Sequence, residues 1–228
     1  MNAQDYAALA VFMLCWLAYE PMLKRLSGGQ GAINADMSLV RAAWVRRMLQ
    51  RDSRIFDASL LGHLLNSASF FASSNLLVIA ASVGVIFSGV NLERSLAQLP
   101  FAASSAAWLA EAKLGLVALA LVRGLLDFVW AIRQLNYCVA LFGAAPLAGD
   151  ARAEAFIEAA RSVLDPALSS FNRGVRSYYF ALAAAAWLIG GWAMAGAVIW
   201  AVVLLAWRQT SSRAAHGVRV AKEALERD

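Results

Sequence analysis

An arginine and an aspartate, Arg123 and Asp127, lie one helical turn apart inside a long apolar stretch. An isolated charge near the bilayer centre costs about 2.5 to 3.5 kcal/mol on insertion scales, so both residues should face protein or water. Trp130 and Gln134 continue the same helical stripe, and Asn75 is a polar residue in another apolar stretch. This set predicts an intramembrane polar path for an ion or small solute. Alternatively, the arginine and aspartate neutralise each other and only orient their helix.

Few other residues are of the types that carry out catalysis or bind metals. Cys15 and Cys138 lie inside apolar runs without a CxxC spacing, and His63 and His216 stand alone. The HExxH, Walker A, GxGxxG and GxSxG motifs are absent. The sequence therefore predicts no disulfide, no metal site, no cofactor and no enzymatic activity.

The elements that carry these residues are long apolar helices. The chain is 61% hydrophobic and 15% charged, against roughly 45 to 50% and about 25% in soluble domains. Its apolar residues come in runs of about 20, the length that crosses a bilayer as a helix. The sequence predicts an all-α integral membrane helical bundle that forms a single domain over residues 1–228.

About four transmembrane helices are expected, joined by basic connectors. The spans are predicted at about 6–25, 67–88, 109–142 and 177–207, the connectors at 26–66 and 143–176, and a C-terminal tail at 208–228. The last span is longer than one crossing needs, and tilt or a kink at Gly190 and Gly191 would absorb the excess. Two full crossings are not expected there.

Both connectors are expected to contain amphipathic helices at the membrane surface. In the first, Met37, Val40, Trp44 and Met48 form an apolar stripe that predicts a helix lying in the headgroup plane. Its arginines would alternatively bind an anionic ligand. In the second, a helix is expected from Asp150 to Leu164, followed by a new helix start at Asp165 and Pro166.

The distribution of basic residues predicts the orientation. Lys and Arg concentrate in the two connectors. The loop between the second and third spans, which contains Asn91, Glu93 and Pro100, holds only Arg94 and, if it is counted with the loop, Lys113. The connectors should therefore be cytoplasmic, with the N-terminus periplasmic and the chain in the cell (inner) membrane. An even number of spans would place the C-terminal tail outside, although this tail is basic. The net charge of +5 is explained by this placement and by anionic lipids, so no nucleic acid partner is expected.

Several strings in a fixed order between the apolar stretches resemble the family catalogued as Domain of Unknown Function 599. They are RAAWVRRM (41–48), SFFASSN (69–75), WAIRQLNY (130–137) and FNRGVRSYYF (171–180). The resemblance implies a multi-span membrane protein without an established activity. It also implies family-typical positions at Arg41, Trp44, Arg133, Asn136, Asn172, Gly174 and Arg176. The pair formed by Arg123 and Asp127 is not part of what it implies.

Polar residues at the expected cytoplasmic ends of the spans suggest a second site. They would bind an anionic group, either lipid phosphate or a soluble ligand, and lipid headgroups are always present at that depth. The candidate residues are Arg41, Arg47, Arg133, Asn136, Asn172, Arg173 and Arg176.

The favoured function is a homo-oligomeric ion channel or small-solute transporter. Small residues on the second and fourth spans, including Gly84 and Gly191, would let copies of the chain approach closely. The alternative is a non-transporting accessory or scaffold subunit that binds lipid headgroups or a partner membrane protein.

Overall fold

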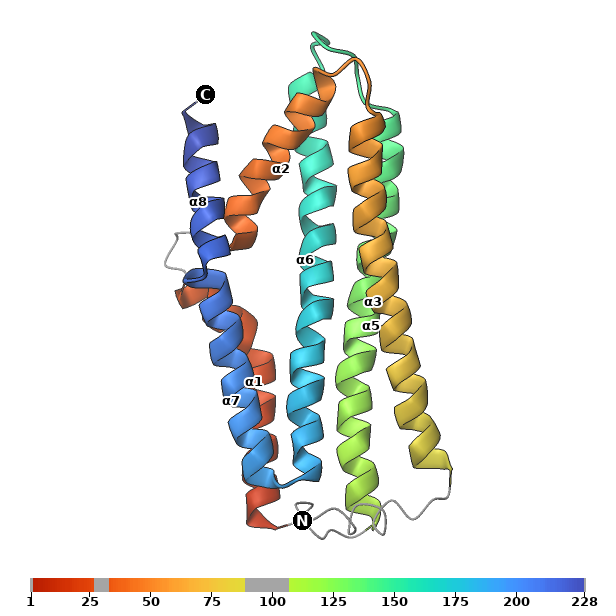
Figure 1. Ribbon diagram of the computed structural model, residues 1–228, viewed down its shortest axis with the longest axis vertical. Coiled ribbons are helices and arrows are strands. Elements are labelled where there is room, and N and C mark those ends of the chain that lie inside the picture. Colours follow the sequence, from red (N-terminus) through yellow and green to blue (C-terminus); the bar gives the residue numbers. More distant parts are fainter. Residues whose placement is uncertain (1, 27–32, 89–106, 228) are drawn as a thin grey trace. The chain divides into compact units, whose positions relative to one another are not determined.

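The computed structural model describes residues 2–26, 33–88 and 107–227, and the regular structure in these ranges is helical throughout. The elements are α1 (Ala3–Leu26), α2 (Ile33–Leu49), α3 (Ile55–Phe87), α5 (Ala107–Gly143), α6 (Ala153–Ala185), the 3-10 helix η1 (Ala186–Leu188), α7 (Gly191–Thr210) and α8 (Arg213–Glu226) (Figure 1). Three of the described stretches, Ile55–Phe87, Trp108–Gly143 and Gly191–Glu226, are long and apolar enough to cross a membrane. The prediction of an all-α membrane bundle is confirmed.

The first three predicted spans correspond to α1, α3 and α5, with one displaced boundary. Helix α3 begins at Ile55, inside the expected connector 26–66. Asp57 in its first turn favours a helix start there, because a carboxylate complements the positive end of the helix dipole. The loop predicted from Asn91 to Pro100 lies outside the described residues.

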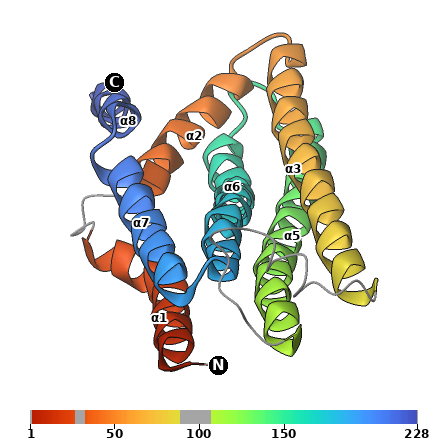
Figure 2. The ribbon, with the colours of Figure 1, turned by 60° about the horizontal axis from the view of Figure 1, so that its bottom comes forward.

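The expected fourth span, 177–207, is not one helix. Helix α6 ends at Ala185, η1 and Gly190 turn the chain, and α7 returns in the opposite direction (Figures 1 and 2). Apolar residues continue through this turn, so hydropathy alone does not reveal it. The expected helix break at Asp165 and Pro166 is also corrected, because α6 continues through Pro166.

The chain divides by its contacts into two compact units. Unit 1 comprises Met1–Leu26, Ser73–Leu126 and Gly174–Ala206, and unit 2 comprises Ser27–Ala72, Asp127–Arg173 and Trp207–Asp228. Helices α3, α5 and α6 each contribute residues to both units.

Unit 1 contains a close contact between its first and last helices. A Cβ atom on Gly191, at the start of α7, would lie 2.9 Å from the carbonyl oxygen of Gln4 in α1. Trp187 Nε1 donates a hydrogen bond of 2.8 Å to Asp5 Oδ1 of α1. Glycine therefore permits an approach that any larger residue would prevent.

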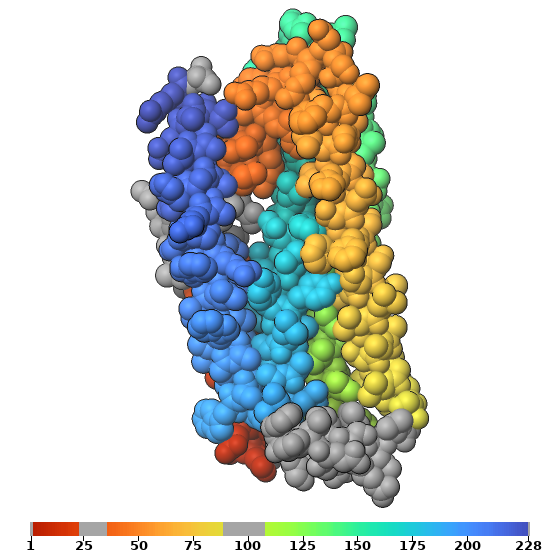
Figure 3. All heavy atoms as spheres, viewed as in Figure 1, coloured from red at the N-terminus to blue at the C-terminus, as the bar shows by residue number. Residues whose placement is uncertain are grey.

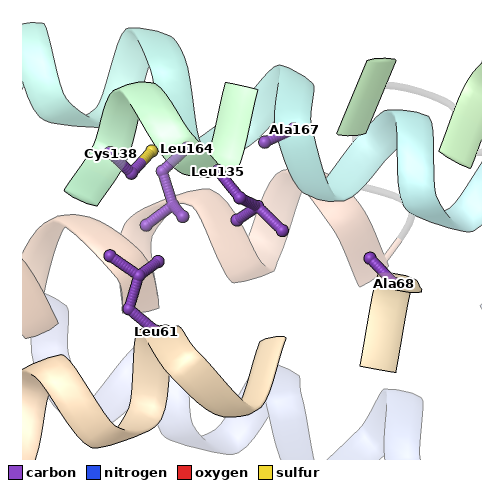
Figure 4. Close-up of a cluster of buried hydrophobic side chains, with 6 residues drawn as sticks. All are labelled: Leu61, Ala68, Leu135, Cys138, Leu164 and Ala167. Atoms are coloured by element: carbon purple, nitrogen blue, oxygen red, sulfur yellow. The ribbon is translucent and has the colours of Figure 1, made fainter. Parts of the chain in front are cut away.

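Unit 2 has an apolar core to which α3, α5 and α6 contribute. Figure 4 shows its buried cluster, in which Leu61 and Leu164 point toward each other. Its members are Leu61, Ala68, Leu135, Cys138, Leu164 and Ala167.

Helix α2 packs on this core through the face that carries Trp44 and Met48. Met48 is 0% exposed, and Trp44 packs against the cluster of Figure 4. The predicted surface stripe therefore faces protein, because α2 covers the ends of α5 and α6 through Val45 and Ile157. Helix α8 in turn lies against α2 (Figure 3).

Candidate functional site

The two residues of the predicted polar path that belong to unit 2, Asp127 and Gln134, are both buried on α5. They are 6% and 5% exposed. Arg173 on α6 donates from Nε to Asp127 Oδ1 over 3.2 Å and from a terminal nitrogen to Ser170 Oγ over 2.7 Å. Gln134 Oε1 has no hydrogen-bond partner among the described residues. Asp127 thus takes part in an ion pair that joins α5 to α6.

The remaining path residues, Asn75 and Arg123, belong to unit 1 and differ in exposure. Asn75 on α3 is fully buried, and its Nδ2 donates to the Leu121 carbonyl of α5 over 2.9 Å. Arg123 is exposed, and so is Trp130 in unit 2. The stripe expected along α5 is therefore divided between buried and exposed positions.

Three arginines of the predicted anionic site are paired with carboxylates of the chain itself. Arg41 is only 7% exposed and contacts Asp165 at 2.5 Å. Arg173 pairs with Asp127, as described above, and in unit 1 Arg176 contacts Glu20 at 2.7 Å. A phosphate would have to compete with a carboxylate at each of these positions.

The other members of that predicted site are more exposed. Arg47 is exposed, and Arg133 donates from Nε to Tyr137 Oη over 2.8 Å. Asn136 is exposed and donates to the Ile132 carbonyl within its own helix, while Asn172 is half-buried. Two of the seven residues, Asn136 and Asn172, are uncharged, and three of the five arginines are paired with carboxylates.

A different carboxylate in unit 2 has the features of a binding site. Asp57, in the first turn of α3, is 1% exposed. Its Oδ1 accepts hydrogen bonds from Trp44 Nε1 of α2, over 2.7 Å, and from Arg51. Its Oδ2 is buried and has no hydrogen-bond partner among the described residues. A buried acceptor without a partner costs about 1 to 3 kcal/mol.

Asp57 lines a cavity of about 380 Å³, a size typical of small-molecule sites. The other lining residues are Arg54 and the apolar Met48, Ala58, Leu61, Val139, Phe142 and Gly143. Arg54 is already engaged, because its two terminal nitrogens donate to the carbonyls of Ala145 and Pro146 over 2.9 and 2.6 Å. The cavity therefore combines a mostly apolar wall with two charged residues, Asp57 and Arg54.

The apolar cluster of unit 2 separates this cavity from Asp127 along α5. Leu135 and Cys138 are both fully buried in the cluster, and they lie in the sequence between Asp127 and the cavity residues Val139 and Phe142. Along α5, these two buried apolar residues therefore lie between Asp127 and the cavity residues.

Sequence reasoning missed the roles of Asp57, Asp165 and Lys113. Asp57 and Asp165 find their arginine and tryptophan partners on other helices, and no local spacing encodes those contacts. Lys113, which was counted with the loop in the comparison of basic residues, lies in α5 and is 2% exposed. In unit 1 its ammonium is 5.9 Å from the ring centre of Trp187, a cation–π arrangement that offsets part of its burial. The useful signal for Asp57 was an acidic residue in the first turn of an otherwise apolar helix.

The long apolar helices define an all-helical integral membrane protein. Residues 7–214 match the family described as "Protein of unknown function, DUF599", and the chain belongs to this family. The resemblance noted in the sequence is thereby confirmed. No curated protein and no solved structure matched the chain.

Proposed function

We propose that this protein is a small-solute transporter and that the cavity beside Asp57 is its solute site. The observation that carries the proposal is a cavity of about 380 Å³ with a mostly apolar wall and two charged lining residues, Asp57 and Arg54. A solute that buries apolar surface against this wall would gain free energy, and that gain supplies a reason for the cavity to be occupied.

The packed cluster of unit 2 favours a carrier over an open channel. A channel needs a continuous polar path, whereas the buried apolar residues Leu135 and Cys138 interrupt the polar positions along α5. Movement of a solute past these residues would require a conformational change, which is the defining property of a carrier.

The accessory or scaffold subunit is the second candidate. It is favoured by the arginines at Arg41, Arg173 and Arg176, whose carboxylate partners give them a role in holding helices together. In this alternative the cavity would take no part in transport. Exposed arginines such as Arg47 would then contact lipid headgroups.

Water access to the cavity distinguishes the candidates. Val139 lines the cavity and is 46% exposed, whereas Val129 on the same helix is 52% exposed and is not part of the cavity lining. We would introduce V139C or V129C into a Cys15→Ser background and treat oriented vesicles with a membrane-impermeant maleimide from either side. A transporter should show labelling of V139C from both sides and little labelling of V129C.

Labelling of V139C from one side only would support the accessory subunit, and an unreactive V139C would contradict the proposed site. Cys138 can remain in place because its side chain is buried.

We also infer the orientation of the chain. Helix α8 contacts α2, and Lys222 Nζ donates to Asp36 Oδ1 over 3.2 Å. Because α2 is part of the basic connector, the positive-inside rule assigns both helices to the cytoplasmic side of the inner membrane and the N-terminus to the periplasm. The turn at Gly190 provides the additional crossing that this arrangement needs.

Homo-oligomerisation through α3 is a further part of the proposal. The most apolar window of α3 is only 6% buried, against 50% for that of α5. A Cβ atom on Gly84 would meet nothing within 4 Å, so a second copy could approach closely at this position. Native mass spectrometry of protein released from nanodiscs should detect an oligomer, and a monomer would contradict this part.

A further inference from the structure

Helix α3 carries a stripe of exposed residues on the side opposite to its buried residues Leu61, Ala68 and Ala72. The stripe, here called the α3 seam, consists of Asn66, Phe70, Ser73, Leu77, Ala80 and Gly84, all of them exposed. Its residues are spaced alternately by four and three positions. This is the heptad spacing of paired helices, which keeps such residues on one line facing a partner helix.

Lipid is a poor neighbour for the polar members of the α3 seam. Asn66 and Ser73 lie near the middle of α3, a helix that is long and apolar enough to cross a membrane. Hydrocarbon offers no hydrogen-bond partner to an exposed amide or hydroxyl, so facing lipid there is costly. Helix α7 differs, because its exposed side chains from Trp192 to Trp207 are all apolar. The exposed face of α7 therefore suits lipid, whereas the α3 seam suits a protein neighbour.

The chemistry of the α3 seam fits a second copy of the same seam. Copies of a chain share one orientation in the membrane, so a two-fold axis along the membrane normal sets each residue of α3 opposite its own counterpart. Asn66 and Ser73 can each pair with their own copy, because amides and hydroxyls both donate and accept hydrogen bonds. None of the six side chains is ionisable, so no like charges meet. The exposed residues of α5 include Arg123 and Arg133, which would oppose their own copies.

The sizes of the remaining seam residues also favour a close pair of helices. A Cβ atom on Gly84 would meet nothing within 4 Å, and Ala80 is one turn away, so two backbones can approach at this end. Phe70 and Leu77 are 67% and 72% exposed and provide apolar contact area. We infer that α3 pairs with α3 of a second copy, parallel and in register, through the α3 seam. The inference rests on the proposed homo-oligomer and deepens it by defining the interface.

Cross-linking between cysteines at identical positions tests the register. We would introduce N66C or L77C into a Cys15→Ser background and oxidise the protein in vesicles with copper phenanthroline. L76C and V78C are the matched controls, because Leu76 and Val78 are 55% and 46% exposed but lie about a quarter turn to either side of the seam. Disulfide-linked dimers should form at least about tenfold faster at N66C and L77C than at L76C and V78C.

Two exposed glycines test the close approach of the helices. G84L should slow the cross-linking of L77C at least about fivefold, because a leucine side chain holds the two backbones apart. G196L on α7 is the matched control, since Gly196 is also exposed and a Cβ atom there also meets nothing within 4 Å. G196L should leave the rate unchanged, and neither substitution should disturb the fold of one copy.

Equal cross-linking rates at Leu76, Leu77 and Val78 would overturn the inference, and so would an unchanged rate in G84L. Native mass spectrometry separates this failure from that of the proposed homo-oligomer. If an oligomer is detected without preferential cross-linking on the α3 seam, the copies associate through another face and only the inference is wrong. If the protein is a monomer and no position cross-links, both are wrong.

Discussion

At the scale of single residues, two arginines of α2 make ion pairs with α6 that differ mainly in burial. The side chains of Arg41 and Asp165 are 8% and 26% exposed, whereas those of Arg46 and Glu154 are 53% and 74% exposed. Water screens the second pair but hardly reaches the first. Both pairs join an arginine of α2 to a carboxylate of α6, so comparing them shows the effect of burial.

Replacing Arg41 with methionine should destabilise the protein by about 3 kcal/mol, because Asp165 then keeps a partly buried charge without its partner. The same change at Arg46 should cost less than about 1 kcal/mol. Denaturant unfolding in detergent, followed by circular dichroism, measures both values. Equal losses for R41M and R46M would show that burial does not govern these pairs.

A second prediction at this scale concerns the stability effect of replacing Gly124 of α5, in unit 1. A Cβ atom there would lie 1.7 Å from Ser177 Oγ and 2.6 Å from Ser177 Cβ, whereas one at Gly115 of the same helix would meet nothing within 4 Å. G124A should therefore lower the thermal midpoint strongly, while G115A should raise it or leave it unchanged. Adding S177G to G124A should recover part of the loss. A neutral G124A would mean that α5 and α6 separate easily at this point.

At the scale of elements, apolar length was enough to predict α5 and most of α3 from the sequence. It was not enough to find the turn between α6 and α7, because η1 and its neighbours are as apolar as the helices that they join. The prediction of a helix break at Pro166 was wrong for another reason. Tertiary contacts override the local sequence pattern there, since Asp165 accepts hydrogen bonds from Arg41 and Ser38 of α2. The candidate site was missed because Trp44 and Asp57 meet only after α2 has folded back on α3.

Helix α8 should depend on one ion pair for its position. Asp36 of α2 is 5% exposed and Lys222 is 33% exposed. K222M should leave the buried Asp36 charge without this partner, weaken the α8 contact and increase tryptic cleavage at Arg213 and Arg219 several-fold.

K222R retains the charge and serves as the control for that experiment. D36N should raise cleavage as K222M does, and the double variant should add little to either change. Unchanged cleavage in K222M would show that apolar contacts alone hold α8 on α2.

At the scale of the whole molecule, the orientation can be tested through the two ends of the chain. Reporter fusions that are active only in the cytoplasm should be active after α8 and inactive before α1. Inactivity at both ends would correspond to the four spans expected from the sequence, with both termini outside. Either this result or activity at both ends would give an even number of crossings and contradict the assignment of the turn at Gly190 to an additional crossing.

The close contact of Gly191 with Gln4 has a consequence for biosynthesis. Helix α1 leaves the ribosome early, but its packing partner α7 is synthesised only after almost the whole described chain. The first helix must therefore wait in the bilayer without its final neighbour, and unit 1 closes only when translation is nearly complete. A nascent chain that stalls before Gly191 would present an unfinished bundle to the machinery that removes incomplete membrane proteins.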